Sequence, residues 1–143
     1  MDRMDRENLF RGKREDNGEW VKGYLWVGNN SSYIIPDNLG VYYDEKEQRI
    51  KSFAYKVYPE TVCQYTGLTD RNGRRYESDI FQADNGNCIQ IYFIVWDEYL
   101  LQWSAECIGD PDGTMPLCEF RTDEIEVIGN IFDNPELLEE GSE

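Results

Sequence analysis

The chain has 143 residues, a formal net charge of −15, four cysteines and no histidine. Apolar residues make up 40% and aromatic residues 14%, which is too much apolar surface for a disordered chain, so this length predicts one folded domain of ordinary size. Without histidine the commonest metal ligand and general base are missing, and the cysteines have no Cys-x-x-Cys spacing, so we expect neither a metal nor a cofactor.

The N-terminal stretch "MDRMDRENLFRGKRED" is charged throughout and lacks the apolar segment of a signal peptide. No apolar run approaches the roughly 18 to 20 residues needed to cross a membrane. We therefore expect a cytoplasmic protein without membrane contact.

Four dipeptides that favour tight hairpin turns punctuate the chain: Asn17-Gly18, Asn72-Gly73, Asn85-Gly86 and Asp112-Gly113. Each lies between runs rich in β-branched and aromatic residues. The run "NCIQIYFIVWDEYLLQWSAEC" predicts one more hairpin, with its turn at Asp97-Glu98. The fold class predicted is therefore mainly β, a β-rich α+β protein built from hairpins.

Two less regular parts complete the prediction of elements. In the middle of the chain, "VYYD" and "IKSFAYKVY" indicate strands joined by a charged turn. Helix signals occur only near the C-terminus, where Thr122 or Asp123 can cap one short turn, and where Asn134 can cap another with Pro135 in the first helical position. We expect short C-terminal helical turns.

The strand order expected from Asp79 onward has the rhythm of a small SH3-like barrel, over about half of the chain. We treat residues 1–143 as a single domain, with subdomains expected at 1–60 (an N-terminal β region), 61–134 (the small barrel) and 135–143 (an acidic tail). Such barrels serve adaptor, nucleic-acid and assembly roles, so the fold does not decide the function.

Charge is distributed unevenly. Residues 1–26 hold six basic and six acidic residues, residues 27–87 hold seven and nine, and residues 88–143 hold one and fourteen. The C-terminal part would repel nucleic-acid phosphates, so we expect no direct nucleic-acid binding through it. An acidic surface facing a partner would instead use Asp97, Glu98, Asp110, Asp112, Asp123, Glu124 and Glu126.

No catalytic constellation stands out. A glycosidase-like site would pair carboxylates such as Glu77, Asp79, Asp97 and Glu98, but with 29 acidic residues such neighbours arise by chance. The serines have no histidine base. Residues 110–121 begin like a calcium loop, but Met115 occupies the position where the loop requires glycine. We assign no catalytic, cofactor-binding or metal-binding residue.

The stretch "QYTGLTDRNGRRYESDI" combines many turn-forming residues. We interpret it as architecture, in which Gly67 ends a strand at Tyr65, Leu68 returns to the core, Asp70 caps a turn and Asn72-Gly73 closes a hairpin. The residues to which we assign this structural role are Gln64, Tyr65, Thr66, Gly67, Leu68, Asp70, Asn72, Gly73 and Asp79.

Three blocks, "LFRGKREDNGEWVKGYL", "PETVCQYTGLTDRNGRRYESDI" and "DEIEVIGNIFDNPELLE", together resemble the YopX family of bacteriophage and prophage proteins. The resemblance runs through the whole chain in order. It implies a small, cytoplasmic, phage-encoded, β-rich protein that self-associates, and it brings no catalytic residue. The family pattern Glu-Gly-Asp is Glu77-Ser78-Asp79 in this chain, and serine enters positive φ less readily than glycine.

Two functions from different classes remain as hypotheses, with an enzyme whose site goes unrecognised as a third. The first is a non-enzymatic, homo-oligomeric binding or assembly module with phage or host protein partners. Its contacts would use aromatic residues, unless these simply fill the core: Trp20, Tyr24, Trp26, Tyr42 and Tyr43. The second is an acidic decoy that resembles DNA in charge and binds a basic host protein through the acidic residues named above.

Overall fold

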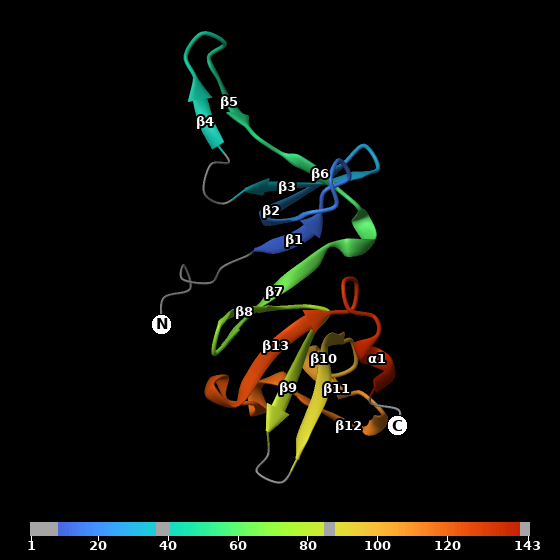
Figure 1. The fold of residues 1–143 in the computed structure, drawn as a ribbon. Coiled ribbons are helices and arrows are strands. Elements are labelled where there is room, and N and C mark those ends of the chain that lie inside the picture. Colours follow the sequence, from blue (N-terminus) through green and yellow to red (C-terminus); the bar gives the residue numbers. More distant parts are fainter. Residues whose placement is uncertain (1–8, 37–40, 85–87, 141–143) are drawn as a thin grey trace. The chain divides into compact units, whose positions relative to one another are not determined.

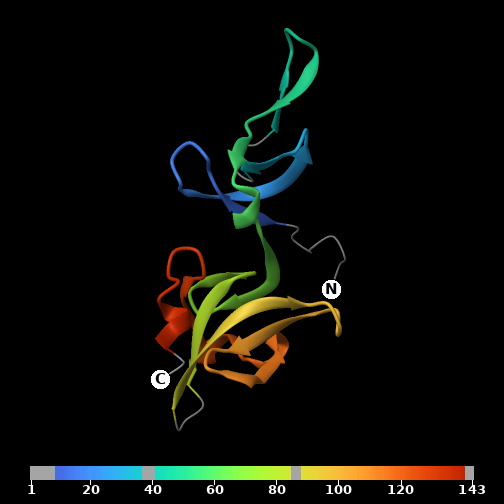
Figure 2. The ribbon, with the colours of Figure 1, turned by 90° about the vertical axis from the view of Figure 1, so that its right-hand side faces the viewer.

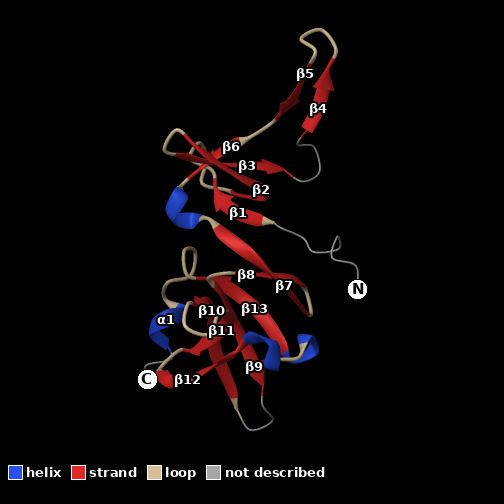
Figure 3. Ribbon diagram, turned by 180° about the vertical axis from the view of Figure 1, so that it is seen from behind, coloured by secondary structure: helices blue, strands red, loops and turns tan. Residues whose placement is uncertain are grey.

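The structure, a computed structural model, describes residues 9–36, 41–84 and 88–140, and within them the chain is mainly β, as predicted (Figure 1). Strands make up most of the described chain, and the helical segments are short (Figure 3). The chain divides into two compact units, Met1–Tyr65 and Thr66–Glu143. The division falls within one strand, β7 (Cys63–Asp70).

The N-terminal unit is built on an antiparallel sheet in which β6, β3, β2, β1 and the first part of β7 are successive neighbours. The turn at Asn17-Gly18 joins β1 to β2 as predicted, with the amide of Gly18 donating to the carbonyl of Arg14 (2.9 Å). The elements of this unit before β7 are β1 (Phe10–Lys13), β2 (Trp20–Gly28), β3 (Ser31–Pro36), β4 (Val41–Asp44), β5 (Arg49–Ser52), β6 (Tyr55–Val57) and the 3-10 turn η2 (Pro59–Thr61).

The end of β1 also reaches β6, which is otherwise an edge strand. Arg14 forms an isolated bridge with Val57, and the amide of Tyr58 donates to the carbonyl of Lys13 (2.9 Å). Thr61, which is buried, accepts a hydrogen bond from the Lys13 amide (2.8 Å) and donates one to the Tyr58 carbonyl (2.6 Å). These hydrogen bonds thus hold the end of β1 against β6 and against the turn that follows it.

The hairpin of β4 and β5 forms a sheet of its own, in agreement with the strands predicted for the middle of the chain. Tyr43 lies opposite Ile50, and Tyr42 lies opposite Lys51. Among the described residues, neither strand is paired in a ladder with any other strand. We call residues 41–53, which comprise this hairpin and Phe53, the arm.

The C-terminal unit holds a five-stranded antiparallel sheet in the order β12-β11-β10-β9-β13, together with the second part of β7 and β8. The sheet has two different edge strands, so within the described residues it forms no closed barrel, and the SH3-like detail of the prediction is not confirmed. Its elements are β8 (Gly73–Tyr76), β9 (Asp79–Asp84), β10 (Ile89–Asp97), β11 (Gln102–Cys107), β12 (Asp110–Pro116), η3 (Leu117–Glu119), η4 (Thr122–Glu124), β13 (Ile125–Asn130) and α1 (Leu137–Glu140).

One face of this sheet carries the main core. Phe81 stacks on Tyr92 at 5.4 Å between ring centroids, and Phe120 meets both rings edge-on at 5.1 and 5.0 Å. Such edge-on and offset pairs each add about 1 kcal/mol beyond area burial. Leu68 packs partly buried against this cluster, which confirms that it returns to the core. The buried members of the cluster are Phe81, Tyr92, Ile94, Ala105, Cys107, Leu117 and Ile125.

The predicted hairpin turns have different outcomes. The hairpin predicted at Asn72-Gly73 joins β7 to β8, with its turn at Arg71-Asn72 and Gly73 as the first residue of β8, and the turn after Asp97 joins β10 to β11 (Figure 2), so both hairpins are confirmed. The prediction at Asp112-Gly113 is wrong, because both residues lie within β12 and the turn is at Ile108-Gly109, where Gly109 has φ +89°. Asn85-Gly86 lies outside the described residues.

The short helical turns near the C-terminus are confirmed, but their predicted caps are not. Arg121 occupies the position before η4, without a side-chain capping hydrogen bond. Asn134 Oδ1 accepts a hydrogen bond from the amide of Asn130 (3.3 Å), which lies before α1. The side chain of Asn130 in turn accepts from the amides of Phe132 and Asp133 (both 3.0 Å), so these asparagines fix the loop between β13 and α1.

Ser78 has φ +72°, a conformation that glycine adopts more easily than any residue with a Cβ. Its amide donates to the carbonyl of Ile94 (2.9 Å), and its carbonyl accepts from the amide of Ile131 (3.1 Å). The backbone is therefore held on both sides in a conformation unfavourable to serine.

Replacing Ser78 by glycine is expected to stabilise the protein by about 1 kcal/mol, because it relieves a positive-φ serine without removing either backbone hydrogen bond. Chemical denaturation measures the free energy of unfolding. Ser31→Gly, in strand β3, is the control and should destabilise by about 0.5 to 1 kcal/mol. Equal destabilisation by both substitutions would contradict the assignment of strain to position 78.

Candidate functional site

The stretch predicted as architecture forms the hairpin of β7 and β8. Gly67 has φ +88°, but β7 continues through it to Asp70, so the prediction that the strand ends at Tyr65 is wrong. Gln64 pairs with Phe10 of β1. The residues of this stretch therefore lie in strands and their turn.

Asp70 is the centre of this hairpin. Its side chain is buried, with Oδ1 accepting the amide hydrogen of Asn72 (2.9 Å) and Oδ2 accepting that of Val127 (2.8 Å). The first hydrogen bond is the predicted turn cap. The second, to β13, was not predicted and joins segments 57 positions apart. One carboxylate thus fixes both the turn and the placement of β13 beside it.

Two more polar side chains of the same stretch make local structural contacts. Thr66 donates from its hydroxyl to the carbonyl of Arg75 (3.1 Å) across the hairpin and accepts from the amide of Leu68 (3.2 Å). Asp79, also buried, accepts a hydrogen bond from the amide of Tyr76 (2.7 Å). These side chains stabilise the backbone of the hairpin and of the connection to β9.

The structure divides the predicted acidic surface between different parts of the sheet. Asp97 and Glu98 lie at the turn between β10 and β11, where Asp97 Oδ1 accepts the amides of Tyr99 and Leu100 (2.9 and 3.0 Å). The other predicted acidic residues belong to the opposite end of the sheet, where β9 ends, β12 begins and β13 begins: Asp110, Asp112, Asp123, Glu124 and Glu126.

A small polar hollow of about 170 Å³ lies at that opposite end. Glu124 and Glu126 line it together with Asp84 and Arg71. The guanidinium of Arg71 donates to the backbone carbonyl of Asp123 (2.8 Å). Glu124 and Glu126 are thus the predicted acidic residues that the structure brings around one hollow.

Most of the aromatic residues proposed as contacts are exposed. Trp20 is half-buried, with the guanidinium of Arg11 lying 4.6 Å from its ring centroid. The explanation that these aromatic residues fill the core is wrong for the remaining four, which are all exposed: Tyr24, Trp26, Tyr42 and Tyr43. Large exposed apolar side chains therefore lie on β2 and on the arm.

Sequence reasoning missed a second exposed apolar group, at the turn between β10 and β11. The side chain of Tyr99 is 98% exposed, and Leu100 and Leu101 are also exposed. Next to this turn, Trp96 of β10 lies opposite Trp103 of β11, and their rings meet edge-on with 5.1 Å between centroids. The signal was present, since three large apolar residues directly follow a predicted turn.

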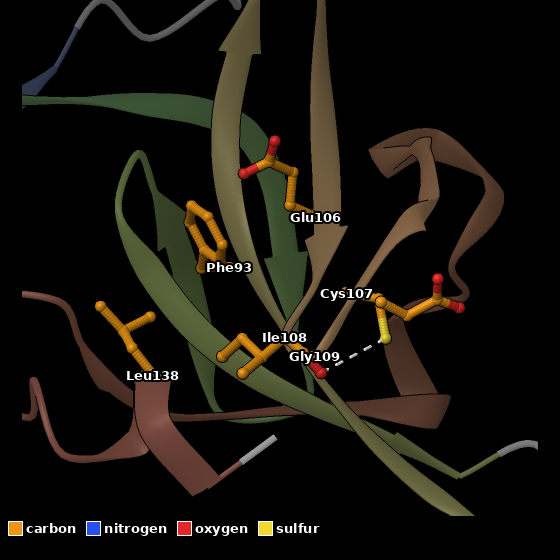
Figure 4. A pocket seen from close by; sticks show the side chains of 7 residues that line it. Phe93, Glu106, Cys107, Ile108, Gly109 and Leu138 are labelled. Carbon is orange, nitrogen blue, oxygen red and sulfur yellow. Dashed lines mark hydrogen bonds between the residues drawn. The ribbon is translucent and has the colours of Figure 1, made fainter. Parts of the chain in front are cut away.

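A larger hollow, of about 460 Å³, was also missed. Figure 4 shows Phe93 of β10, Ile108 of the turn after β11 and Leu138 of α1 around a common space. Glu106, which lies opposite Phe93 on β11, and Asp110 line it as well. The hollow is open and apolar at its centre, with the Glu106 carboxylate at its margin.

Cys107 also borders this hollow, but its sulfur turns away toward the other face of the sheet (Figure 4). Sγ lies 3.3 Å from Oε1 of Gln90 and 3.8 Å from the carbonyl of Ile108. Burial, followed by the nearby Asp110 carboxylate, raises the pKa of the Cys107 thiol above its usual value. A raised pKa keeps the thiol protonated at neutral pH, which opposes its use as a nucleophile.

In the native protein, Cys88 and Cys118, which are exposed, are expected to react with a thiol reagent such as Ellman's reagent at pH 8. Cys63 and Cys107 should react on the order of 100-fold more slowly, because both are buried and because the thiolate of Cys107 is disfavoured. Stopped reactions analysed by peptide mass spectrometry would identify the sites. Fast modification of Cys107 would contradict the burial described here.

Within residues 9–36, 41–84 and 88–140, no group of three or more Cys, Asp and Glu residues is arranged to hold a metal ion. No helix in the same ranges has the length and apolar composition needed to cross a membrane.

The family model described as "YopX protein" matches residues 9–139. The chain is also similar in fold to the crystal structure of protein EF1440 from Enterococcus faecalis, with a TM-score of 0.60 and 19% sequence identity over 92% of this chain and 98% of that chain. No curated protein sequence matches the chain.

Proposed function

Because the chain belongs to the YopX family, we propose that it is a non-enzymatic, self-associating β-rich assembly module whose copies meet through the arm. The observation that carries this proposal is the exposed apolar surface of a hairpin that pairs with no other strand among the described residues. A two-stranded hairpin alone is at best marginally stable in water. Four large apolar side chains of the arm are exposed: Tyr42, Tyr43, Ile50 and Phe53.

The charges of the arm favour a second copy as its partner. Two chains of net charge −15 repel each other, so they associate most easily where the charge is balanced. The arm holds three acidic and three basic residues, whereas the C-terminal unit holds eighteen acidic and four basic residues. The arm therefore combines apolar exposure with electrostatic neutrality, unlike the exposed apolar turn between β10 and β11 in the acidic C-terminal unit.

Ion pairs within the arm satisfy much of its charge. Lys51 lies 3.1 Å from Asp44 and 2.9 Å from Glu47, and Arg49 lies 2.8 Å from Glu47. The hydrogen bond from Lys51 lowers the pKa of Asp44, and the hydrogen bond to Glu47 is the main cause of the raised pKa of Lys51. The arm can therefore offer a partner its apolar surface, together with the outer edges of β4 and β5, which pair with no other strand in the described part of the chain.

The test is to replace Tyr43, which is 60% exposed, by glutamate and to measure molecular mass by light scattering and sedimentation. The wild-type protein should assemble, and the variant should dissociate with a dissociation constant about tenfold or more higher, because a charge enters the contact. Tyr99→Glu is the matched control, with the same substitution at an exposed turn of the other unit. A monomeric wild-type protein, or assembly lost only in the control, would refute the proposal.

The acidic decoy is the second candidate, and the concentration of charge in one unit favours it. The C-terminal unit carries a net charge of −14, and five of the acidic residues proposed for the decoy lie at one end of its sheet. Such a surface would speed the encounter with a basic, DNA-binding host protein. Under this hypothesis the protein acts in the cytoplasm of the bacterial host cell.

Affinity purification from nuclease-treated host lysate, at low and high salt and with or without duplex DNA, tests the decoy. A basic host protein displaced by both salt and DNA would support it. A partner retained under all these conditions would contradict it, since a contact that mimics DNA must be weakened by DNA and by salt.

A further inference from the structure

The apolar hollow beside α1 carries an inference that does not depend on the arm. Phe93 and Leu138 are half-buried, whereas Ile108 forms a buried floor. These side chains come from β10, from the turn after β11 and from α1, three segments of one unit. A volume of about 460 Å³ accommodates one or two large side chains.

The charge around the hollow restricts what can enter it. Of the seven residues that line it, Glu106 and Asp110 are acidic and none is basic. The unit around it has four arginines, of which Arg71 and Arg121 already contact Asp123. The negative potential of this surface repels an acidic ligand and adds no electrostatic attraction for a neutral one. It attracts a cationic ligand.

We propose that the hollow is a docking site for a basic, amphipathic segment of a partner protein, in which a leucine or aromatic side chain enters between Phe93, Ile108 and Leu138 while a flanking lysine or arginine faces Glu106. The apolar anchor supplies most of the affinity, and the Glu106 carboxylate, with the acidic surface of the unit around it, supplies the orientation and the faster association.

The test is a titration of the full-length, ¹⁵N-labelled protein with two synthetic peptides, observed by NMR. One has the sequence Lys-Lys-Leu-Phe-Lys-Lys with blocked ends, and the other has glutamate in place of each lysine. The lysine peptide is expected to shift the amide signals of Phe93, of residues 106–110 and of Leu138, with an affinity that falls as salt rises. The glutamate peptide should leave them unchanged.

Two variants separate the apolar contribution from the ionic one. Leu138→Ser should raise the dissociation constant for the lysine peptide about fivefold, since it removes one apolar wall. Glu106→Gln should raise it about twofold to threefold at low salt and weaken its salt dependence. Leu100→Ser, at the exposed turn between β10 and β11, is the control and should change nothing.

Several results would overturn the proposal: binding of neither peptide, equal binding of both, signal changes centred on the β10–β11 turn, or unchanged affinity in Leu138→Ser and Glu106→Gln. Repeating the titration with Tyr43→Glu protein distinguishes this proposal from the preceding one. Loss of assembly through the arm should leave peptide binding intact, and a monomeric wild-type protein can still bind the peptide.

Discussion

Replacing Gly23 by alanine is expected to destabilise the N-terminal unit by about 3 kcal/mol or more. Gly23 lies in the middle of β2, between Phe10 of β1 and Pro36 of β3. A Cβ at this position would overlap the backbone carbonyl of Ile35. Because the obstacle is backbone rather than a flexible side chain, the strands must separate, and the pairing of β2 with β3 is lost locally.

Urea denaturation followed by tryptophan fluorescence measures this effect, since Trp20 and Trp26 lie on the same strand. Gly18→Ala is the control, because Gly18 has φ +75° but open space around its Cβ position, and the expected cost is about 1 kcal/mol. If Gly23→Ala and Gly18→Ala lowered the free energy of unfolding equally, β2 and β3 would have to lie further apart at Gly23 than described here.

Replacing Asp70 by asparagine should cost about 2 to 3 kcal/mol, although the two side chains have almost the same shape. Both carboxylate oxygens of Asp70 accept backbone amides, one from Asn72 and one from Val127. Asparagine offers one oxygen and one NH₂ group, so one buried amide would face a donor instead of an acceptor. The turn or the contact with β13 must then be lost.

Asp97→Asn is the matched control for this prediction. Asp97 also accepts two backbone amides, from Tyr99 and Leu100, but both reach the same oxygen. Asparagine can keep both hydrogen bonds, so the change in the free energy of unfolding should stay within about 0.5 kcal/mol. Thermal and chemical denaturation would contradict this explanation if Asp70→Asn and Asp97→Asn lowered the free energy of unfolding by similar amounts. The loss of a negative charge, rather than the loss of an acceptor, would then explain the destabilisation of Asp70→Asn.

Local sequence signals predicted much of the hairpin architecture. The turns at Asn17-Gly18 and Asn72-Gly73 are confirmed because their conformational preference belongs to two adjacent residues. The same reasoning failed at "CIGDPDG", where two glycine turns compete within a few residues. There the register of β11 with β12, in which Cys107 pairs with Asp110, places the turn at Ile108-Gly109, and the dipeptide rule does not specify which of the two turns forms.

The site features that escaped prediction depend on residues far apart in the chain. The contact of Asp70 with Val127 joins two segments whose proximity no local pattern indicates. The hollow beside α1 likewise combines Phe93, Ile108 and Leu138 from three segments. Tyr42 and Tyr43 are exposed because, in the described chain, no other strand pairs with the arm. Composition alone does not show which hairpin is left without such neighbours.

The exposure of Cys88 and Cys118 has a consequence for any study of assembly. Air oxidation would join two copies through an intermolecular disulfide, and such covalent dimers persist in denaturant and imitate association in a mass measurement. Assembly through the arm should survive in a reducing buffer and in the variant Cys88→Ser/Cys118→Ser. Dimers that disappear under both conditions are disulfide-linked through these thiols and are no evidence of assembly through the arm.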